Sequence, residues 1–292
     1  MWKVIGSTGK PLISYPGTFP DKIYRYRSVS PKTLDRLINF EILEEGIYLA
    51  GLKDLNDPDE GRFLVSFEGT RDEIASYLKD GLKGVGTAMS TREAERLAYE
   101  RADEIIAADG RVPKRVVDYT RHVIEQVLRV ACFTTLPTNY SMWANYAKYF
   151  DSSDAALGHG GVCIEYACDE NWRSVNLHPV LYSDDIPRIN PVPRDEAELV
   201  KAVYSKSSEW RCENEWRAFM VIQSTPPFPE NLTENSKIRV EGGVSGVVFG
   251  LKTPNEIITE VRQRLEQAGR KVSLRQVVRD PTTYDRVLRD VV

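Results

Sequence analysis

The sequence predicts an α+β fold within a single domain. Strand-patterned segments dominate the centre of the chain, and helical segments interrupt them without the regular alternation of a βαβ protein. Residues 70–129 are rich in charged side chains and have helical spacing, which predicts a helical insert. A chain of 292 residues can bury one large core. We therefore expect one domain over residues 1–292, with mixed or antiparallel central sheets and the insert within it.

The first regular elements are expected after a lead-in rich in glycine and proline over residues 1–20. Residues 23–27 alternate aromatic and basic side chains, which is typical of a strand. Ser30 and Pro31 then suit the N-cap and the first position of a helix. The sequence Asn56-Asp-Pro58 predicts a turn, because Asn and Asp bond the local backbone.

The rest of the chain divides into strands and helices by the period of its apolar residues. Strands are expected over residues 129–135, 162–166, 175–182, 209–223, 237–240, 246–250 and 272–278. Helices are expected over residues 141–150, 195–208 and 254–267.

Bulk composition indicates a soluble globular protein. The chain is 41% hydrophobic and 28% charged, and its net charge of −4 argues against a surface that binds nucleic acid all over. No apolar run approaches the ~18 residues that a membrane-spanning helix needs. The first residues lack the apolar stretch of a secretory signal. We expect a cytoplasmic protein without membrane contact.

Cysteine and histidine usage predicts no metal site. The four cysteines form no Cys-x-x-Cys pair, and the three histidines are scattered. Free, buried thiols in a reducing compartment are expected for Cys132, Cys163, Cys168 and Cys212.

Basic residues gather toward the end of the chain, with eight between Arg262 and Arg289. Such a run is often one solvated helix face. It also predicts a weak contact with nucleic acid through residues 262–289.

The segment from Lys206 to Arg217 carries the strongest chemical signal. If residues 209–223 form a strand, Glu213, Glu215 and Arg217 share one face. Adjacent carboxylates disfavour each other's ionisation, and a neighbouring arginine offsets that effect. The group fits a catalytic pair, but its spacing alone is more typical of a charge ladder on a solvated sheet face.

An ordered set of short motifs resembles the bacterial domain-of-unknown-function family 2971. The matches run from about residue 23 to about residue 285. They are Tyr24-Arg-Tyr-Arg27 followed by the Leu34–Ile38 segment, Asn56-Asp-Pro58, Cys132-Phe-Thr134, Trp143-Ala-Asn-Tyr-Ala147, Gly161-Val-Cys-Ile-Glu165, Lys206 with Trp210 to Arg217, and residues 247–250. The family name implies no activity.

The order of these pieces also resembles the ADP-ribosyltransferase fold. That fold places Arg or His on an early strand, here Arg25 or Arg27, and Glu-x-Glu on a late one, here Glu213-Asn-Glu215. Its middle strand carries Ser-Thr-Ser, where this chain has Phe133-Thr-Thr135, and the 70–129 insert is a second departure. The resemblance implies a protein that uses NAD as a substrate for ADP-ribosyl transfer or NAD cleavage, in a bacterial or phage conflict setting such as a toxin or phage defence.

Cleaving nicotinamide from NAD builds positive charge on the ribose, which a carboxylate can stabilise. We assign that role to Glu215, and to Glu213 the orientation or deprotonation of an acceptor whose identity stays open. The resemblance implies cofactor-binding roles for seven further residues. These are a pyrophosphate grip by Arg25 or Arg27, a hydrogen bond to glutamate or ribose from Thr134 or Thr135, and stacking on nicotinamide by Tyr24, Tyr26 or Tyr146.

Structural explanations stay open beside these roles. The tyrosines also fit core packing, and the threonines fit ordinary strand residues. One rival function is a non-catalytic ligand-sensing or interaction module in which Glu213, Glu215 and Arg217 form a structural ion network. Another is a nucleic-acid-processing defence protein that combines residues 262–289 with acidic residues, namely Asp57, Asp59 and Glu60.

Overall fold

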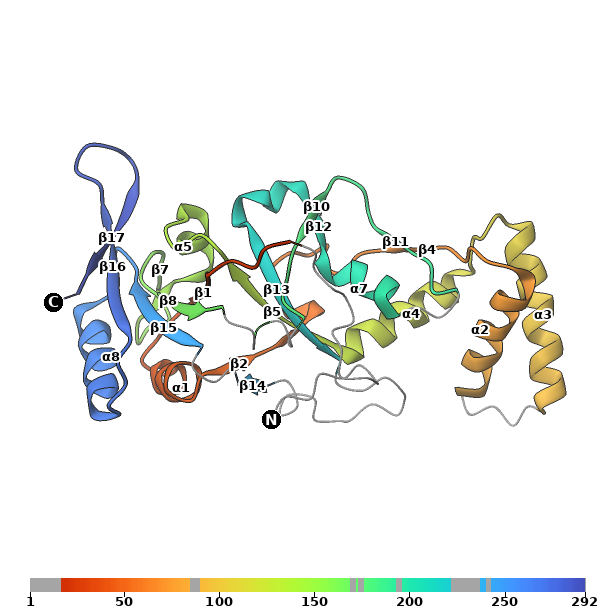
Figure 1. Cartoon of the computed structure of the whole chain (residues 1–292), viewed down its shortest axis with the longest axis horizontal. Coiled ribbons are helices and arrows are strands. Elements are labelled where there is room, and N and C mark those ends of the chain that lie inside the picture. The colour runs from red at the N-terminus through yellow and green to blue at the C-terminus, as the bar shows by residue number, and fades with distance from the viewer. Residues whose placement is uncertain are drawn as a thin grey trace.

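The computed structural model describes residues 17–84, 90–168, 172, 176–192, 196–221, 237–239 and 243–291. Its main element is a nine-stranded sheet, and the fold class is α+β as expected (Figure 1). The strands are β1 (Lys22–Arg27), β3 (Ala50–Gly51), β5 (Leu128–Thr134), β8 (Val162–Ala167), β9 (His178–Pro179), β13 (Glu215–Val221), β15 (Val244–Phe249), β16 (Ser273–Arg279) and β17 (Arg286–Asp290).

The sheet is mixed. Its order is β17-β16-β15-β8-β1-β5-β13-β9, and β3 pairs with β5 outside this path. Strands β15 and β16 run parallel, and the other neighbours are antiparallel. Helix α8 (Asn255–Gln267) makes the crossover between the two parallel strands, as a parallel pair requires.

Shorter elements surround this sheet. The two-stranded pairs are β10 (Leu181–Ser183) with β12 (Ser205–Ser207), β11 (Arg188–Ile189) with β4 (Leu64–Val65), β14 (Lys237–Arg239) with β2 (Gly46–Tyr48), and β6 (Tyr149–Phe150) with β7 (Ala156–Leu157). The other helical segments are α1 (Leu34–Arg36), the π-helix η1 (Leu37–Leu43), η2 (Leu52–Asp54), α2 (Arg71–Gly84), α3 (Thr91–Ala107), α4 (Lys114–Val127), α5 (Tyr140–Tyr146), α7 (Glu196–Tyr204) and the 3-10 helix η3 (Ser208–Glu213).

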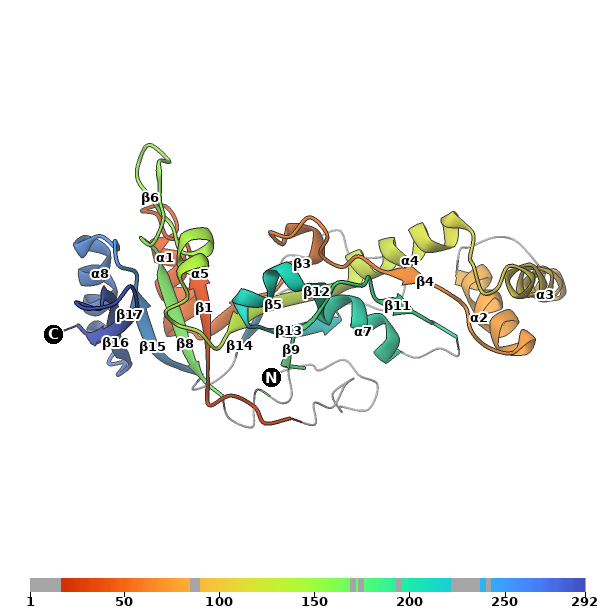
Figure 2. The same ribbon diagram turned by 90° about the horizontal axis from the view of Figure 1, so that it is seen from above.

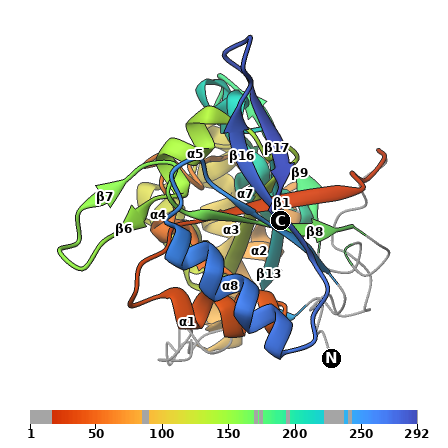
Figure 3. The same ribbon diagram turned by 90° about the vertical axis from the view of Figure 1, so that its left-hand side faces the viewer.

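The two faces of the sheet carry different layers. Helices η1 and α8 pack on one face, where Ile23 and Phe133 contribute to the largest apolar cluster. Helix α5 covers the opposite face, where Tyr24 and Tyr26 pack with Trp143. Figure 3 shows α5 on one side of β1 and β8, with α1 and α8 on the other. Alternation along β1 therefore sends its tyrosines and its arginines to opposite faces.

One row of residues crosses the middle of the sheet. Glu165, Tyr24, Thr134 and Glu215 lie directly opposite one another on β8, β1, β5 and β13. The ladder joins β1 to β5 at the single pair Tyr24 and Thr134, whereas β5 and β13 pair over seven positions. Figure 2 shows the strands changing direction between β1 and β5. The row therefore sits where the sheet bends.

The helical insert projects at one end of the molecule (Figure 1). Helices α2 and α3 pack together around Ala75, Ala98 and Ile105. The chain leaves and re-enters the body at one place, because the Phe67 N–H donates to the Gly110 carbonyl at 3.0 Å. Helix α4 runs directly into β5, and its Ile124 belongs to an apolar cluster shared with the sheet.

Several predicted elements are confirmed, including strand β1 and helix α8. The expected strand over 209–223 is wrong in its first part, because residues 208–213 form the 3-10 helix η3. Asn214, at φ 45° in the left-handed region, separates η3 from β13. The expected helix over 141–150 ends at Tyr146, and Phe150 lies in β6. The predicted lead-in over 1–20 lies outside the described residues up to residue 16.

Candidate functional site

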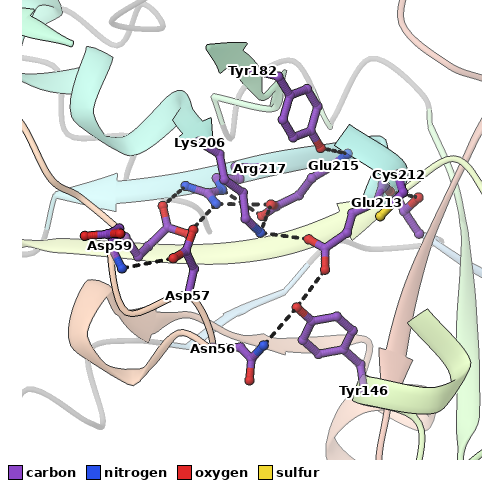
Figure 4. A network of polar contacts seen from close by, with 12 residues as sticks. Asn56, Asp57, Asp59, Tyr146, Tyr182, Lys206, Cys212, Glu213, Glu215 and Arg217 are labelled. Carbon is purple, nitrogen blue, oxygen red and sulfur yellow. Dashed lines mark hydrogen bonds and ion pairs between the residues drawn. The ribbon is translucent and has the colours of Figure 1, made fainter. Parts of the chain in front are cut away.

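A buried ion network occupies the end of β13 (Figure 4). Lys206 Nζ donates to Glu213 Oε2 at 2.7 Å and to Glu215 Oε2 at 2.9 Å. Arg217 donates to Glu215 Oε1 at 2.7 Å and makes two hydrogen bonds with Glu60, at 2.6 and 2.8 Å. All five side chains are at most 6% exposed. Three carboxylates thus share two cations in a site that is largely closed to water.

The network reaches solvent beside Glu213. Tyr146 donates its hydroxyl hydrogen to Glu213 Oε1 at 2.7 Å, and Asn56 Nδ2 lies 3.4 Å from the same hydroxyl. Tyr146 is half-buried and Asn56 is exposed. The Asn56-Asp-Pro58 segment forms the predicted turn, since Asp57 Oδ1 accepts from the Asp59 N–H at 2.9 Å. That turn also brings Asn56 to the outer end of the site.

Local backbone geometry brings the two glutamates together. Ser207 caps the start of η3, and Asn214 ends η3 in the left-handed conformation before β13 begins at Glu215. Buried Thr134 donates its hydroxyl to the Glu213 carbonyl at 2.6 Å, which fixes the end of η3 against β5. Tyr182 accepts from the Glu215 N–H at 2.8 Å. The carboxylates meet at Lys206 although one lies on a helix and the other on a strand.

Electrostatics hold Glu215 in its charged form. Burial alone would raise the pKa of Glu215, but Arg217 and Lys206 outweigh burial and set it at about 2. Burial likewise opposes the charge of Lys206, yet Glu215 and Glu213 raise its pKa above the ordinary value. Glu60 differs, because burial raises its pKa despite Arg217. Glu215 therefore cannot exchange a proton near neutral pH, and its contribution there is a fixed negative charge.

Cys132 and Tyr146 stay protonated beside this network. Burial raises the pKa of the Cys132 thiol, and Glu215 adds to the shift. Burial and Glu213 raise the pKa of Tyr146. Both groups are therefore hydrogen donors to carboxylates at neutral pH.

Not all predicted site residues on the face of Tyr24 belong to this ion network. Tyr24 itself belongs to a second network, which is centred on Glu165. Tyr24 lies beside Glu165, and burial followed by Glu165 raises its pKa to about 12. Glu165 accepts from Lys22 and from Ser245, each at 2.9 Å, and pairs with Arg275. Tyr24 thus belongs to the neighbouring network of β8, one position along the row from Thr134.

Two further predicted residues have local structural contacts. Tyr26 donates its hydroxyl to the Leu136 carbonyl at 2.6 Å and packs edge-on against Trp143. The Thr135 hydroxyl meets the Asn214 side chain at the turn before β13.

The structure does not bring Arg25 and Arg27 to the glutamate pair. Arg25 donates to the Tyr48 carbonyl at 2.7 Å and lies over the Phe133 ring. Arg27 donates to Glu41 Oε1 at 2.6 Å. Both arginines occupy the face of β1 that packs on η1, because alternation along the strand separates them from Tyr24. The guanidinium that accompanies Glu215 is that of Arg217.

Sequence reasoning gave Lys206 no chemical role and offered Glu60 only to the nucleic-acid alternative. Lys206 does stand in the same sequence motif as the glutamates, a few residues before Glu213-Asn-Glu215. Glu60 is separated from Arg217 by 157 residues, so local spacing carries no trace of their contact.

The basic residues of 262–289 do not form one free surface. Arg264 pairs with Asp35 and Glu260, Arg270 with Glu45, and Arg275 with Glu165. Among the described residues, no group of three or more His, Cys, Asp or Glu side chains is arranged to hold a metal ion. The four cysteines are free, but the expectation of burial is wrong for Cys212, which is exposed.

Comparison with known proteins gives no relative for this chain. No family model, curated protein or solved structure matches it. The described part of the chain also contains no helix with the length and apolarity required to span a membrane.

Proposed function

We propose that the chain is an ADP-ribosyltransferase-like protein that uses NAD as a substrate, for ADP-ribosyl transfer or NAD cleavage. The observation that carries the proposal is the open end of the ion network. Three carboxylates share two cations in the network, and Glu213 contacts the half-buried Tyr146, which lies beside the exposed Asn56. An excess of buried negative charge favours a ligand that is cationic or becomes so.

NAD fits this charge pattern because its nicotinamide ring is a pyridinium and its ribose becomes cationic as the glycosidic bond breaks. The C–N bond to nicotinamide breaks, and its electron pair leaves with nicotinamide. The acceptor then bonds to the ribose carbon and gives its proton to Glu213. Glu215, ionised with a pKa of about 2, supplies fixed negative charge.

In this proposal Tyr146 keeps its predicted role, whereas the roles of Thr134, Arg25 and Arg27 change. Tyr146 stacks on the ligand in this proposal, which its half-buried position beside Glu213 supports. Thr134 is a positioning residue, since its hydroxyl donates its hydrogen to the Glu213 carbonyl. Arg25 and Arg27 take no part in gripping the pyrophosphate.

Nicotinamide release from labelled NAD, with cell lysate as a source of acceptor, tests the proposal. We expect wild-type protein to release nicotinamide and Glu213→Gln and Glu215→Gln to lose ~10²–10³ in rate. Glu45→Gln is the matched control, because Glu45 is likewise buried, at 2% exposed, and is paired with an arginine at 2.6 Å outside this network. Wild type that releases no nicotinamide and labels no component of any lysate would overturn the proposal.

A second candidate is a non-catalytic ligand-sensing or interaction module. The specific observation in its favour is that every carboxylate oxygen of Glu213 and Glu215 already accepts a hydrogen bond. Calorimetry separates the two functions. Saturable NAD binding without turnover, weakened in Tyr146→Ala, favours the sensing module, whereas turnover favours the enzyme.

A further inference from the structure

A third polar cluster lies on the face of β1 opposite Tyr24, within the largest apolar cluster. Its members are Arg25 and Arg27 on β1, Glu41 on η1 and Tyr166 on β8. Arg25 is 8% exposed, Glu41 1% and Tyr166 0%. Their neighbours are apolar, with Ile23, Ile164 and Phe133 among them. Charged groups are rarely placed in such surroundings without a complement.

The hydrogen bonds of this cluster are half complete. Arg25 Nη2 and Arg27 Nη2 have acceptors in the Tyr48 carbonyl and Glu41 Oε1. Four other buried atoms have no hydrogen-bond partner among the described residues, namely Arg25 Nη1, Arg27 Nε, Glu41 Oε2 and the Tyr166 hydroxyl. Buried polar groups in folded proteins are nearly always partnered, so four such atoms in one cluster indicate that something else serves them.

The four groups are close enough to act on one ligand. Arg25 and Arg27 are two residues apart and share a strand face. Burial lowers the pKa of Arg25, the like charge of Arg27 lowers it further, and Glu41 and Tyr166 act in the opposite direction. Glu41 is presented by a π-helix, a rare helical form that occurs often at functional sites. The Arg27 side chain keeps 29% of its surface exposed, which gives the cluster a route to solvent.

We propose that this cluster binds a small oxyanion that carries its own proton, namely hydrogen phosphate or the monoprotonated terminal group of a phosphate monoester. Two guanidinium groups against one carboxylate leave an excess positive charge, which selects an anion. The free N–H groups of Arg25 and Arg27 donate to its oxygens. Glu41 Oε2 needs a donor, and the P–O–H group supplies one. Sulfate matches the shape and the acceptors but has no proton to give at neutral pH.

Isothermal titration calorimetry with inorganic phosphate, a small phosphate monoester and sulfate, at matched ionic strength, tests this site. We expect saturable phosphate binding that is stronger than sulfate binding by about tenfold or more, because a buried acceptor rejects a ligand that lacks the donor. The monoester is measured at about pH 6, where about half of it keeps a P–O–H group and sulfate still has none, and it shows whether the occupant is free phosphate or a phosphorylated molecule.

Variants then assign the selectivity. Glu41→Gln puts an amide donor at the same position and should abolish the preference for phosphate over sulfate. Arg25→Lys keeps the charge but removes the free guanidinium donor, and should weaken both anions. Glu45→Gln, a buried carboxylate paired with Arg270 instead, should bind as wild type does.

Two results would overturn the proposal. If wild type binds neither phosphate, monoester nor sulfate, ordered water serves the four atoms. If phosphate and sulfate bind equally to wild type, the contact is a general effect of anions. Both results come from the wild-type protein, so they stand even where a variant fails to fold. The site is independent of the NAD proposal, because that proposal is tested by nicotinamide release at the other face of the sheet.

Discussion

Lys206 is the residue on which the glutamate pair depends. Its ammonium lies within 2.9 Å of an oxygen from each carboxylate, and its side chain is 6% exposed. Two glutamates without it would repel each other, and one would take up a proton. Trp210 also stabilises the Lys206 ammonium, since its ring centroid lies 4.7 Å from that group.

The depressed pKa of Glu215 predicts how stability depends on pH. An unfolded glutamate titrates near 4.5, whereas the folded protein keeps Glu215 ionised down to about 2. The stabilisation is therefore complete above the unfolded value and is lost as pH falls through this window. As the pH is lowered from about 5 to about 2, we expect the free energy of unfolding, measured in urea, to fall less steeply in Glu215→Gln than in wild type.

The control for this measurement is Glu209→Gln, which changes an exposed carboxylate of the same 3-10 helix. It should reproduce the wild-type curve. Equal slopes in wild type and Glu215→Gln between about pH 5 and about pH 2 would show that the ion network does not hold this charge.

At the scale of elements, Gly161 joins β1, α5 and β8. Its N–H donates to the Ala147 carbonyl at 2.8 Å, and its own carbonyl accepts from Thr253 Oγ1 at 2.7 Å. A Cβ at this position would overlap the Arg27 carbonyl and lie 2.7 Å from the Ala147 carbonyl carbon. The close approach that sets the end of α5 therefore needs a residue without a side chain.

Substitution of two glycines should have opposite effects. We expect Gly161→Ala to destabilise the protein by about 1–3 kcal/mol, because backbone atoms must shift to admit the methyl group. Gly81→Ala, in helix α2 with nothing within 4 Å of the added Cβ, should stabilise by about 1 kcal/mol. Urea unfolding of both variants checks this. Similar effects at the two positions would contradict the packing seen at Gly161.

Sequence patterns predicted elements whose signals are local. The aromatic-basic alternation of β1 and the apolar spacing of α8 each lie within one segment, and both elements form as expected. The strand prediction for residues 208–213 was wrong because Trp210 and Cys212 alternate with polar residues as they would in a strand. The left-handed backbone at Asn214 ends that pattern, and only the assembled fold reveals it.

The candidate site was predictable in its carboxylates but not in its partners. Tyr24, Thr134 and Glu215 do align across three strands. Arg25 also lies on a strand as predicted, but the packing of η1 determines which face of the sheet its side chain occupies. Contacts between distant segments, such as Glu60 with Arg217, depend on tertiary structure and leave no periodicity to detect.

For the whole molecule, the main structural division lies between the sheet and the helical hairpin of α2 and α3. The apolar cluster of the hairpin is built mainly by α2 and α3, and Val192 of the body also belongs to it. The chain enters and leaves the hairpin at Phe67 and Gly110, whose backbones are hydrogen-bonded. The isolated bridge between Ser66 and Arg111 closes the same neck. The ion network lies in the body, among residues of β12, η3 and β13 together with Glu60.

Excision of the hairpin should leave the sheet folded. We propose a variant in which a short glycine linker joins Glu68 to Gly110, with Phe67→Ser to remove the ring that excision would expose. Urea unfolding should stay cooperative with a smaller m-value, since less surface is exposed on unfolding. Amide hydrogen exchange should show β5 and β13 still protected. Loss of that protection would mean that the hairpin is required for the body to fold.

The exposed thiol of Cys212 offers a way to observe the site without altering its charges. Cys212 precedes Glu213 directly, and its carbonyl accepts from Asn139 at 2.5 Å. Cys163 is buried and Cys132 and Cys168 are only partly accessible, so a thiol-reactive fluorophore has one preferred attachment point. Dye emission from that point would report movement of the 3-10 helix as candidate ligands are titrated.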